Sequence, residues 1–275
     1  MARFLILDAY AARGRERLVS GGAPLAGDMY REMLLRHRPD AECDIFYVAD
    51  PNTHLPQPLE TYDAMLWTGS SLTIYDDVPE VTQQIELARR AYQMGVPAYG
   101  SCWALHLAVV AAGGTCQRSP HGLTFGPTYD ITLTPEGEAH PVFQTRQSGF
   151  EALASHYDIV KTLPSGAKPL AQSPRSQVQA VFIEHEKGSF FATQYHPEFD
   201  FSVLHGMLQS RLNTLVEQGF YADPRAAETQ AAEFARLAEA NPPEDLIAKY
   251  RLTDNVVIAE QRHTEFRNWL DLLAL

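Results

Sequence analysis

The chain has 275 residues, of which 45% are hydrophobic, and this suits one large α/β domain with an appendage. Its formal net charge of −12 at pH 7 disfavours anionic partners, so neither nucleic acid nor a membrane surface is an expected partner. Cys43, Cys102 and Cys116 are too few and too widely spaced for a disulfide framework or a zinc site. A reducing compartment, the cytoplasm, is therefore the expected location, and neither a signal-peptide core nor a membrane-spanning run is evident.

The first half of the chain alternates short apolar runs with segments of helical period. Apolar runs lie at 4–7, 43–48, 64–67 and 96–99, and helical patterns at 27–37, 79–95 and 103–114. This alternation is typical of βαβ units and predicts a mostly parallel sheet flanked by helices. Pro79 suits the first turn of its helix and Gly95 the position just past its end. Asp76 and Asp77 are predicted to cap the same helix and to complement its dipole.

Beyond residue 120 the pattern changes to shorter pieces rich in Thr, Phe and turn residues. It predicts a small antiparallel portion with a hairpin turn at 186–189. After 202 the chain is predicted to be helical, with a proline-rich break at 241–246. These amphipathic helices are expected to pack on their own domain; docking on a partner or a second copy, as in a homodimer, is the alternative. The polar stretch 11–28 is either a flap over the site or a simple surface loop.

Cys102 lies between the apolar run 96–99 and a helical segment, where an open α/β fold places ligands. Gly100 and Ser101 are small enough for a tight turn there. The amides of a helix N-terminus favour a thiolate and can hold a developing oxyanion, in particular the N–H of Trp103. The alternative is that Cys102 is a small buried hydrophobic residue, and the local sequence alone does not separate the two.

The segment 190–200, FFATQYHPEFD, contains the base that a thiol nucleophile needs. Pro197 disfavours helical geometry for His196, and an extended His-Pro-Glu places the first and third residues on one side. Glu198 can then orient the imidazole and leave its other ring nitrogen facing Cys102. A His-Pro is also common where a strand turns, but its occurrence together with the cysteine turn favours a catalytic pair.

At this point four motifs, at 68–77, 99–114, 155–173 and 192–200, follow one another in the order found in class I glutamine amidotransferases. Over about residues 40–205 the chain resembles the free-standing members that are similar to the glutaminase domain of GMP synthase. The resemblance implies a flavodoxin-like α/β fold, with an amidotransferase-like domain at 1–205 and a helical extension at 206–275. It also implies a triad of Cys102, His196 and Glu198, a γ-glutamyl thioester and release of ammonia. No cofactor and no metal are expected.

The resemblance assigns Gly69 to the oxyanion loop, where its N–H acts beside that of Trp103. A Gly-containing turn directly after the run 64–67 agrees, because it lets a backbone amide approach the substrate; an ordinary turn is the alternative. Ser70 is predicted to bind substrate from the same turn. Ser155 and His156 match a loop that lines the glutamine pocket in the family. The alternative there is a strand-end turn with Asp158 solvated.

Two residues depart from the family pattern. Ala104 replaces the last glycine of Gly-x-Cys-x-Gly, which costs little if its dihedral angles are those of a helix. His106 replaces the glutamine usually found four residues after the nucleophile, which contacts the bound substrate in the family. Imidazole offers hydrogen bonds in a different geometry, so His106 either binds substrate or packs in the core. The resemblance therefore does not establish free glutamine as the substrate.

Three functions remain open at this stage. The first is a glutamine amidotransferase-like thiol hydrolase that makes ammonia for a separate synthase. The second is a γ-glutamyl peptidase or hydrolase that cleaves a small-molecule γ-glutamyl amide other than free glutamine. The third is a catalytically silent binding protein on the same fold. The first two use Cys102, His196 and Glu198 identically, and the intact set of three argues against the third.

Overall fold

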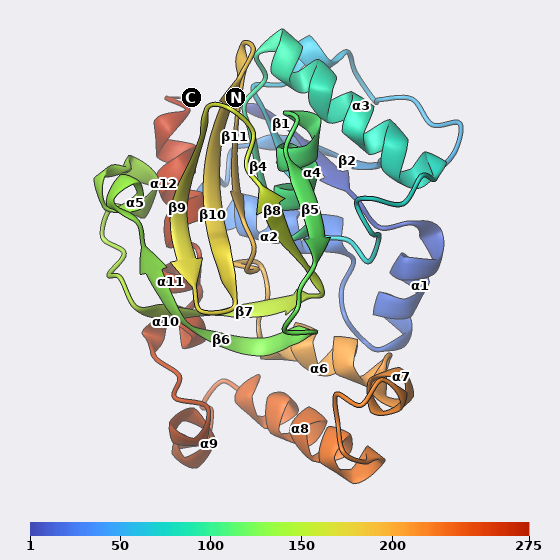
Figure 1. The fold of residues 1–275 in the computed structure, drawn as a ribbon, viewed down its shortest axis with the longest axis vertical. Coiled ribbons are helices and arrows are strands. Elements are labelled where there is room, and N and C mark those ends of the chain that lie inside the picture. The colour runs from blue at the N-terminus through green and yellow to red at the C-terminus, as the bar shows by residue number, and fades with distance from the viewer. Residues whose placement is uncertain (275) are drawn as a thin grey trace.

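The computed structural model describes residues 1–274 and has a nine-stranded sheet at its centre (Figure 1). The strand order is β2-β1-β3-β4-β11-β10-β9-β6-β7. The strands β2 (Glu42–Tyr47), β1 (Arg3–Asp8), β3 (Ala64–Trp67), β4 (Ala98–Ser101) and β11 (Gly188–Thr193) are parallel neighbours. Antiparallel pairing then adds β10 (Ser176–His185), β9 (Ala167–Ser173), β6 (Thr124–Leu133) and β7 (Phe150–His156). The predicted mostly parallel sheet with antiparallel strands is confirmed. A separate antiparallel pair is formed by β5 (Thr115–Arg118) and β8 (Asp158–Thr162).

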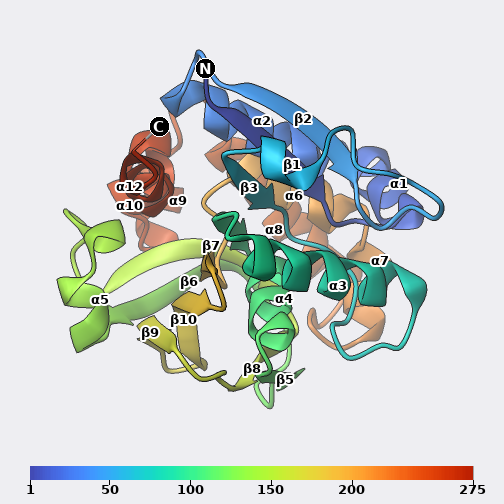
Figure 2. The same cartoon turned by 90° about the horizontal axis from the view of Figure 1, so that it is seen from above.

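Helices cover both faces of the parallel strands, because side chains along each strand alternate between two apolar layers. In β1, Leu5 and Leu7 pack in the layer that contains Trp67 and Trp103, whereas Phe4 and Ile6 pack with Tyr30. The first face is covered by α3 (Pro79–Met94) and α4 (Trp103–Ala111). The second is covered by α2 (Ala26–His37) and by α12 (Thr264–Leu272). Figure 2 shows α3 on one side of β1 and β3, and α2 on the other.

The prediction that Asp76 and Asp77 cap α3 is wrong. The N-cap residue is Val78, which makes no side-chain capping bond, and Pro79 occupies the first turn as predicted. Gly95 ends α3 in the left-handed conformation, with φ 81°, which is the geometry that favours glycine at this position. A proline at the start already lacks one of the N–H groups that a cap would satisfy, so the demand for a side-chain cap is smaller.

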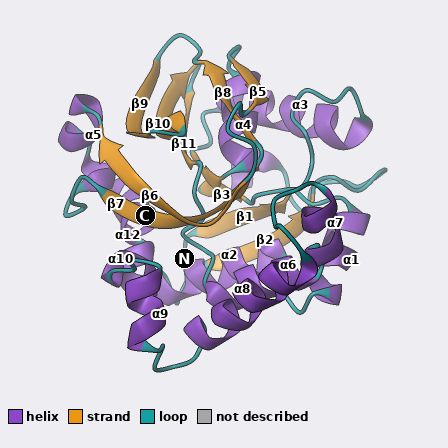
Figure 3. Cartoon of the chain, turned by 60° about the horizontal axis from the view of Figure 1, so that its bottom comes forward, coloured by secondary structure: helices purple, strands orange, loops and turns teal. Residues whose placement is uncertain are grey.

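The polar stretch 11–28 is not a simple surface loop, because it contains α1 (Ala12–Ser20) and the start of α2. Its role as a flap over the site stays a prediction. Leu18 of α1 is buried, and the end of α1 lies against α6 (Phe201–Gln209). A Cβ on Gly21 would come within 2.0 Å of the carbonyl oxygen of Gly206, so glycine is required for this approach. Figure 3 shows α1, α6 and α7 (Leu212–Glu217) grouped together.

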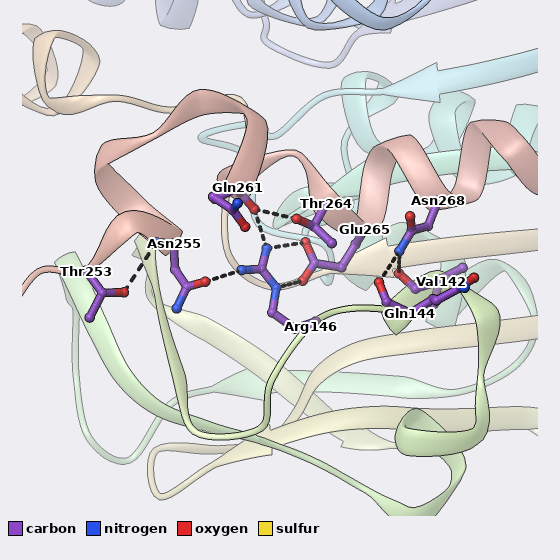
Figure 4. Close-up of polar contacts among 9 residues, drawn as sticks. All are labelled: Val142, Gln144, Arg146, Thr253, Asn255, Gln261, Thr264, Glu265 and Asn268. Atoms are coloured by element: carbon purple, nitrogen blue, oxygen red, sulfur yellow. Dashed lines mark hydrogen bonds and ion pairs between the residues drawn. The ribbon is translucent and has the colours of Figure 1, made fainter.

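The C-terminal helices return to the sheet and complete its core. Phe266 and Trp269 of α12 contact the ring of Tyr99 in β4, with centroid distances of 4.9 and 5.4 Å. Arg146, from the loop before β7, forms a bidentate ion pair with Glu265 of α12 (Figure 4). The Cys102 turn therefore rests on a strand that the C-terminal segment itself supports.

Helix α8 (Pro224–Leu237) packs on α6. The remaining elements are short, namely η1 (Leu59–Thr61), α5 (Pro135–Ala139), η2 (Pro141–Phe143), α9 (Glu244–Lys249), α10 (Asp254–Val257) and α11 (Ala259–Arg262). Within residues 1–274, none of the helices is both long enough and apolar enough to cross a bilayer.

Candidate active site

Cys102 occupies a strained turn between β4 and α4. Its φ is 53° and its ψ −99°, an unusual backbone conformation for a residue with a side chain. The turn is held from β11, because the N–H of Cys102 donates to the carbonyl of Thr193 at 2.6 Å. A Cβ on Gly100 would lie 2.3 Å from that of Ala104 and 2.5 Å from the Trp67 carbonyl oxygen. Gly100 therefore has to be glycine for the strand and the helix to meet this closely.

His196 and Glu198 form a buried pair beside this turn. The Nδ1 of His196 lies 2.7 Å from Oε1 of Glu198, and the side chains are 3% and 2% exposed. Phe199 stacks on the imidazole, with ring centroids 3.8 Å apart. Among the described residues, Nε2 of His196 has no hydrogen-bond partner. The second ring nitrogen is thus free to exchange a proton with the thiol or a substrate.

The backbone of Gly69 lies against both His196 and Cys102. A Cβ there would be 2.7 Å from Cε1 of His196 and 3.8 Å from Cβ of Cys102. Any larger residue would displace the imidazole. The three predicted triad residues and Gly69 are therefore brought together at the carboxyl ends of β3, β4 and β11.

Burial alone would lower the pKa of His196, but the charges of Glu198 and Cys102 outweigh it and raise the pKa to about 10. A protonated imidazole is thus stabilised between the two groups. Sγ of Cys102 lies 3.7 Å from the carbonyl oxygen of Ser155.

A hydroxyl chain supports Glu198 from behind, and the sequence reasoning did not include it. Ser101 donates to Oε1 of Glu198 at 2.7 Å, and Tyr30 of α2 donates to the Ser101 hydroxyl at 2.8 Å. The position of Ser101, next to the nucleophile, was the available signal. Nothing in the sequence around Tyr30 indicates this contact.

A cavity of about 100 Å³ opens beside Cys102. Five residues predicted for the oxyanion site or the substrate pocket line it, namely Ser70, Trp103, His106, Ser155 and His156. Trp103 is the first residue of α4, so its N–H is one of those without a partner inside the helix. Its indole is held in the core by a hydrogen bond to Gln84 at 3.0 Å.

The two histidines of the cavity are held neutral. His106 lies 2.9 Å through Nε2 from Oε1 of Gln194, and burial lowers its pKa. His156 lies 3.0 Å through Nδ1 from the carbonyl of Asp158, and burial together with the nearby His106 lowers its pKa to about 3. Both rings serve as uncharged walls with fixed hydrogen bonds.

The same cavity brings together one cation and one anion that sequence reasoning did not select. Arg118 of β5 stacks over the ring of Tyr157, 4.6 Å from its centroid. Asp158 is buried rather than solvated and accepts a hydrogen bond from Tyr75 at 3.0 Å. The pairing of β5 with β8 places these charges on one wall, and that pairing was not predicted. No cluster of three metal-ligating side chains occurs within residues 1–274.

The sequence matches the model of the family described as glutamine amidotransferase class-I over residues 26–215. It is 34% identical to a γ-glutamyl-L-1-hydroxyisopropylamide hydrolase of a Pseudomonas species, over 99% of this chain and 93% of that protein. It is 28% identical to a glutamine-hydrolysing GMP synthase of Sulfurimonas denitrificans, over 64% of this chain and only 33% of that protein. A glutamine amidotransferase structure from Thermotoga maritima superposes with a TM-score of 0.65 at 16% identity, covering 99% of this chain and 97% of that one.

The fold and the full-length relationship to a named hydrolase define an α/β enzyme that hydrolyses an amide C–N bond. Within that class, the chain belongs to the class I glutamine amidotransferase family. The resemblance seen in the sequence motifs is thereby confirmed.

Proposed function

We propose that the enzyme hydrolyses a γ-glutamyl amide through Cys102, His196 and Glu198. The supporting observation is the strained Cys102 turn, which faces a buried His196–Glu198 pair whose Nε2 is left unbonded. An oriented base next to a thiol on a strand-to-helix turn is the arrangement that nucleophilic acyl transfer requires.

The reaction divides into two balanced halves. His196 holds the proton of Cys102 as an imidazolium beside the thiolate, and the thiolate attacks the γ-carbonyl carbon, forming a C–S bond and an oxyanion. Collapse of that intermediate breaks the C–N bond, and His196 returns the proton to the departing amine. Water, deprotonated by His196, then attacks the γ-glutamyl thioester and forms a C–O bond. The C–S bond breaks, glutamate leaves, and the thiolate is restored beside the protonated His196. Glu198 keeps the imidazole oriented and stabilises its protonated form throughout.

The developing oxyanion is held in this proposal by the N–H groups of Gly69 and Trp103. The close approach of Gly69 to His196 and Cys102 and the position of Trp103 at the start of α4 support this role. Two backbone donors in a buried site stabilise charge that appears only in the transition state.

The charges of the cavity suit the α-carbon end of a γ-glutamyl group. Arg118 pairs with an α-carboxylate and Asp158 with an α-ammonium group, while Ser70, Ser155, His106 and His156 supply the polar wall. A zwitterion that is matched on both charges is bound without leaving a buried charge unpaired. The cavity of about 100 Å³ is of a size for this small acyl group.

The amide of a larger amine is favoured over free glutamine as the substrate. The chain aligns with nearly the whole of the Pseudomonas γ-glutamyl-L-1-hydroxyisopropylamide hydrolase, whereas it spans about a third of the GMP synthase. His106, which is turned toward Gln194, stands where the family has a glutamine that contacts substrate. Delivery of ammonia to a separate synthase remains the second candidate, on the strength of the GMP synthase relatives.

Mass spectrometry of Cys102 after rapid mixing with γ-glutamyl amides tests the proposal. The wild-type enzyme is expected to carry a γ-glutamyl adduct on Cys102, and Cys102→Ala to lose turnover while keeping its unfolding midpoint. His196→Ala is expected to slow adduct formation. Wild-type turnover in the folded Cys102→Ala variant would disprove the assignment of the nucleophile. Equal formation of the adduct from glutamine and from larger amides would remove the preference proposed here.

A further inference from the structure

A second cavity, of about 190 Å³, lies next to the first. Ser71 and Tyr157 line both, so the two cavities adjoin at these side chains, and Cys102 lines the first. The second cavity is enclosed by Gly14 and Leu18 of α1 on one side and by Met207 of α6 and Leu215 of α7 on the other. Figure 3 shows these three helices together. Since ammonia is about the size of a water molecule, whose share of liquid volume is about 30 Å³, ammonia alone would leave this cavity largely empty.

Two arginines line this second cavity without a carboxylate partner. Arg211 bonds through Nη2 to the hydroxyl of Ser155 at 3.2 Å and through Nε to the carbonyl of Met207 at 3.2 Å. It also stacks on Phe125, 5.0 Å from the ring centroid. Neither Arg211 nor Arg17 forms an ion pair with any residue in the range 1–274. A guanidinium that is fixed by neutral acceptors and left without an anion retains attraction for an oxygen acceptor.

The position of Arg211 connects it to the reacting atoms. Its Ser155 partner is the residue whose carbonyl faces the thiol of Cys102. Tyr10, which also lines the second cavity, is close enough to Cys102 that burial and then the charge of Cys102 raise its pKa. Its phenol therefore stays protonated and is available as a donor.

We propose that this second cavity binds the leaving amine of the substrate and that Arg211 selects amines carrying an acceptor oxygen, either a hydroxyl or a carboxylate. The assignment rests on the proposed γ-glutamyl amide hydrolysis. The acyl group occupies the cavity of Arg118 and Asp158, and the amine extends from the scissile bond toward Arg211, with Leu18, Met207 and Leu215 contacting its carbon atoms.

The test compares three γ-glutamyl amides whose amines differ at one substituent: isopropylamine, 2-amino-1-propanol and alanine. In the wild-type enzyme, kcat/KM is expected to be at least about tenfold higher for one or both oxygen-bearing amides than for the isopropylamide, as one charge-assisted hydrogen bond allows. Arg211→Met is expected to remove this preference, because kcat/KM falls more for the oxygen-bearing amides than for the isopropylamide until the three values are about equal. Comparison of kcat/KM between the 2-amino-1-propanol amide and the alanine amide shows whether a hydroxyl or a carboxylate oxygen is preferred. Arg211→Lys, which keeps the charge, is expected to retain part of the preference.

Two controls separate this role from others. Arg118→Met, in the acyl cavity, is expected to lower kcat/KM for all three amides by the same factor. Arg89→Met, at an exposed position on α3, is expected to change none of them. Equal kcat/KM values for the three amides in the wild type, or a preference that persists in Arg211→Met, would overturn the assignment. An equal loss on all three in Arg211→Met would also overturn it, because it would show a purely structural role through Ser155. Wild-type enzyme inactive on every γ-glutamyl amide would instead refute the proposed function, and the inference with it.

Discussion

The charges of Glu198 and Cys102 together hold the pKa of His196 high against the effect of burial. Glu198→Gln keeps the size of the side chain and removes its charge, so burial is opposed less strongly and the pKa of His196 falls from about 10. Because the departing amine needs the imidazolium proton, the alkaline limb of kcat/KM is expected near pH 10 in the wild type and closer to neutrality in the variant. We also expect kcat to fall by roughly 10³–10⁴-fold. Full pH–rate profiles check this, with Glu198→Asp as the charge-retaining control. An unmoved alkaline limb would contradict it.

Contacts between residues close in sequence were predictable, whereas contacts between side chains from distant segments were not. The His-Pro-Glu segment has to place His196 and Glu198 on one side, whatever surrounds it, and the two side chains do meet. Tyr30 of α2, by contrast, reaches the site through Ser101 at the end of β4, and Arg211, between α6 and α7, reaches it through Ser155 of β7. Such contacts depend on the assembled layers, which local sequence does not encode. The catalytic roles themselves stay predictions.

A buried ion pair anchors the helix α12, and removal of one partner leaves the charge of the other uncompensated. Arg146 and Glu265 have side-chain exposures of 4% and 0%, and Arg146 also bonds to Asn255 and to the carbonyl of Gln261 (Figure 4). Glu265→Gln is expected to lower the free energy of unfolding by about 3–5 kcal/mol, because a buried guanidinium remains. Arg146→Met combined with Glu265→Gln is expected to recover part of that loss. Urea unfolding measures both.

A matched pair on the same helix supplies the control. Arg38 contacts Asp271 of α12 at 2.6 Å, but Asp271 is 61% exposed. Asp271→Asn is therefore expected to cost less than about 1 kcal/mol. Equal losses of unfolding free energy in Glu265→Gln and Asp271→Asn would contradict the role of burial in the contribution of the Arg146–Glu265 pair.

Element by element, the strands and helices with a strong apolar period were predictable, and the ends and polar segments were not. The run AMLW coincides with β3, and the helical pattern at 79–95 with α3. The helix α1 was missed because its sequence is mostly polar and its two buried positions, Gly14 and Leu18, give little periodic signal. Its packing against α6 supplies the stability that its own sequence lacks. The boundary between domain and extension near 205 stays a prediction, since helices on both sides of it contribute to common apolar layers.

Across the whole molecule, the first and last thirds of the chain are joined by two histidines that must stay neutral. Nε2 of His37 on α2 lies 3.0 Å from Nδ1 of His263, at the start of α12. Burial, followed by the charge of Arg262, lowers the pKa of His263 to about 3. Burial, followed by the charge of Arg267, lowers the pKa of His37. The charged groups that act on one or both rings are Arg36, Arg38, Arg262, Arg267 and Glu260.

The stability of the enzyme is therefore expected to fall as the pH drops below about 6.5, the ordinary pKa of histidine. Above that pH both folded and unfolded chains hold these rings neutral, so their contribution is fully present. Below it these histidines bind protons in the unfolded chain but stay neutral in the folded chain. Each of them then lowers the free energy of unfolding by up to about 1.36 kcal/mol per pH unit. Urea unfolding between pH 8 and pH 5 is expected to show a shallower slope in His263→Gln than in the wild type. Equal slopes in the two proteins would mean that protonation of other groups causes the loss of stability. The difference in the free energy of unfolding between the two proteins at pH 8, where the histidines are neutral, measures the packing lost in the variant.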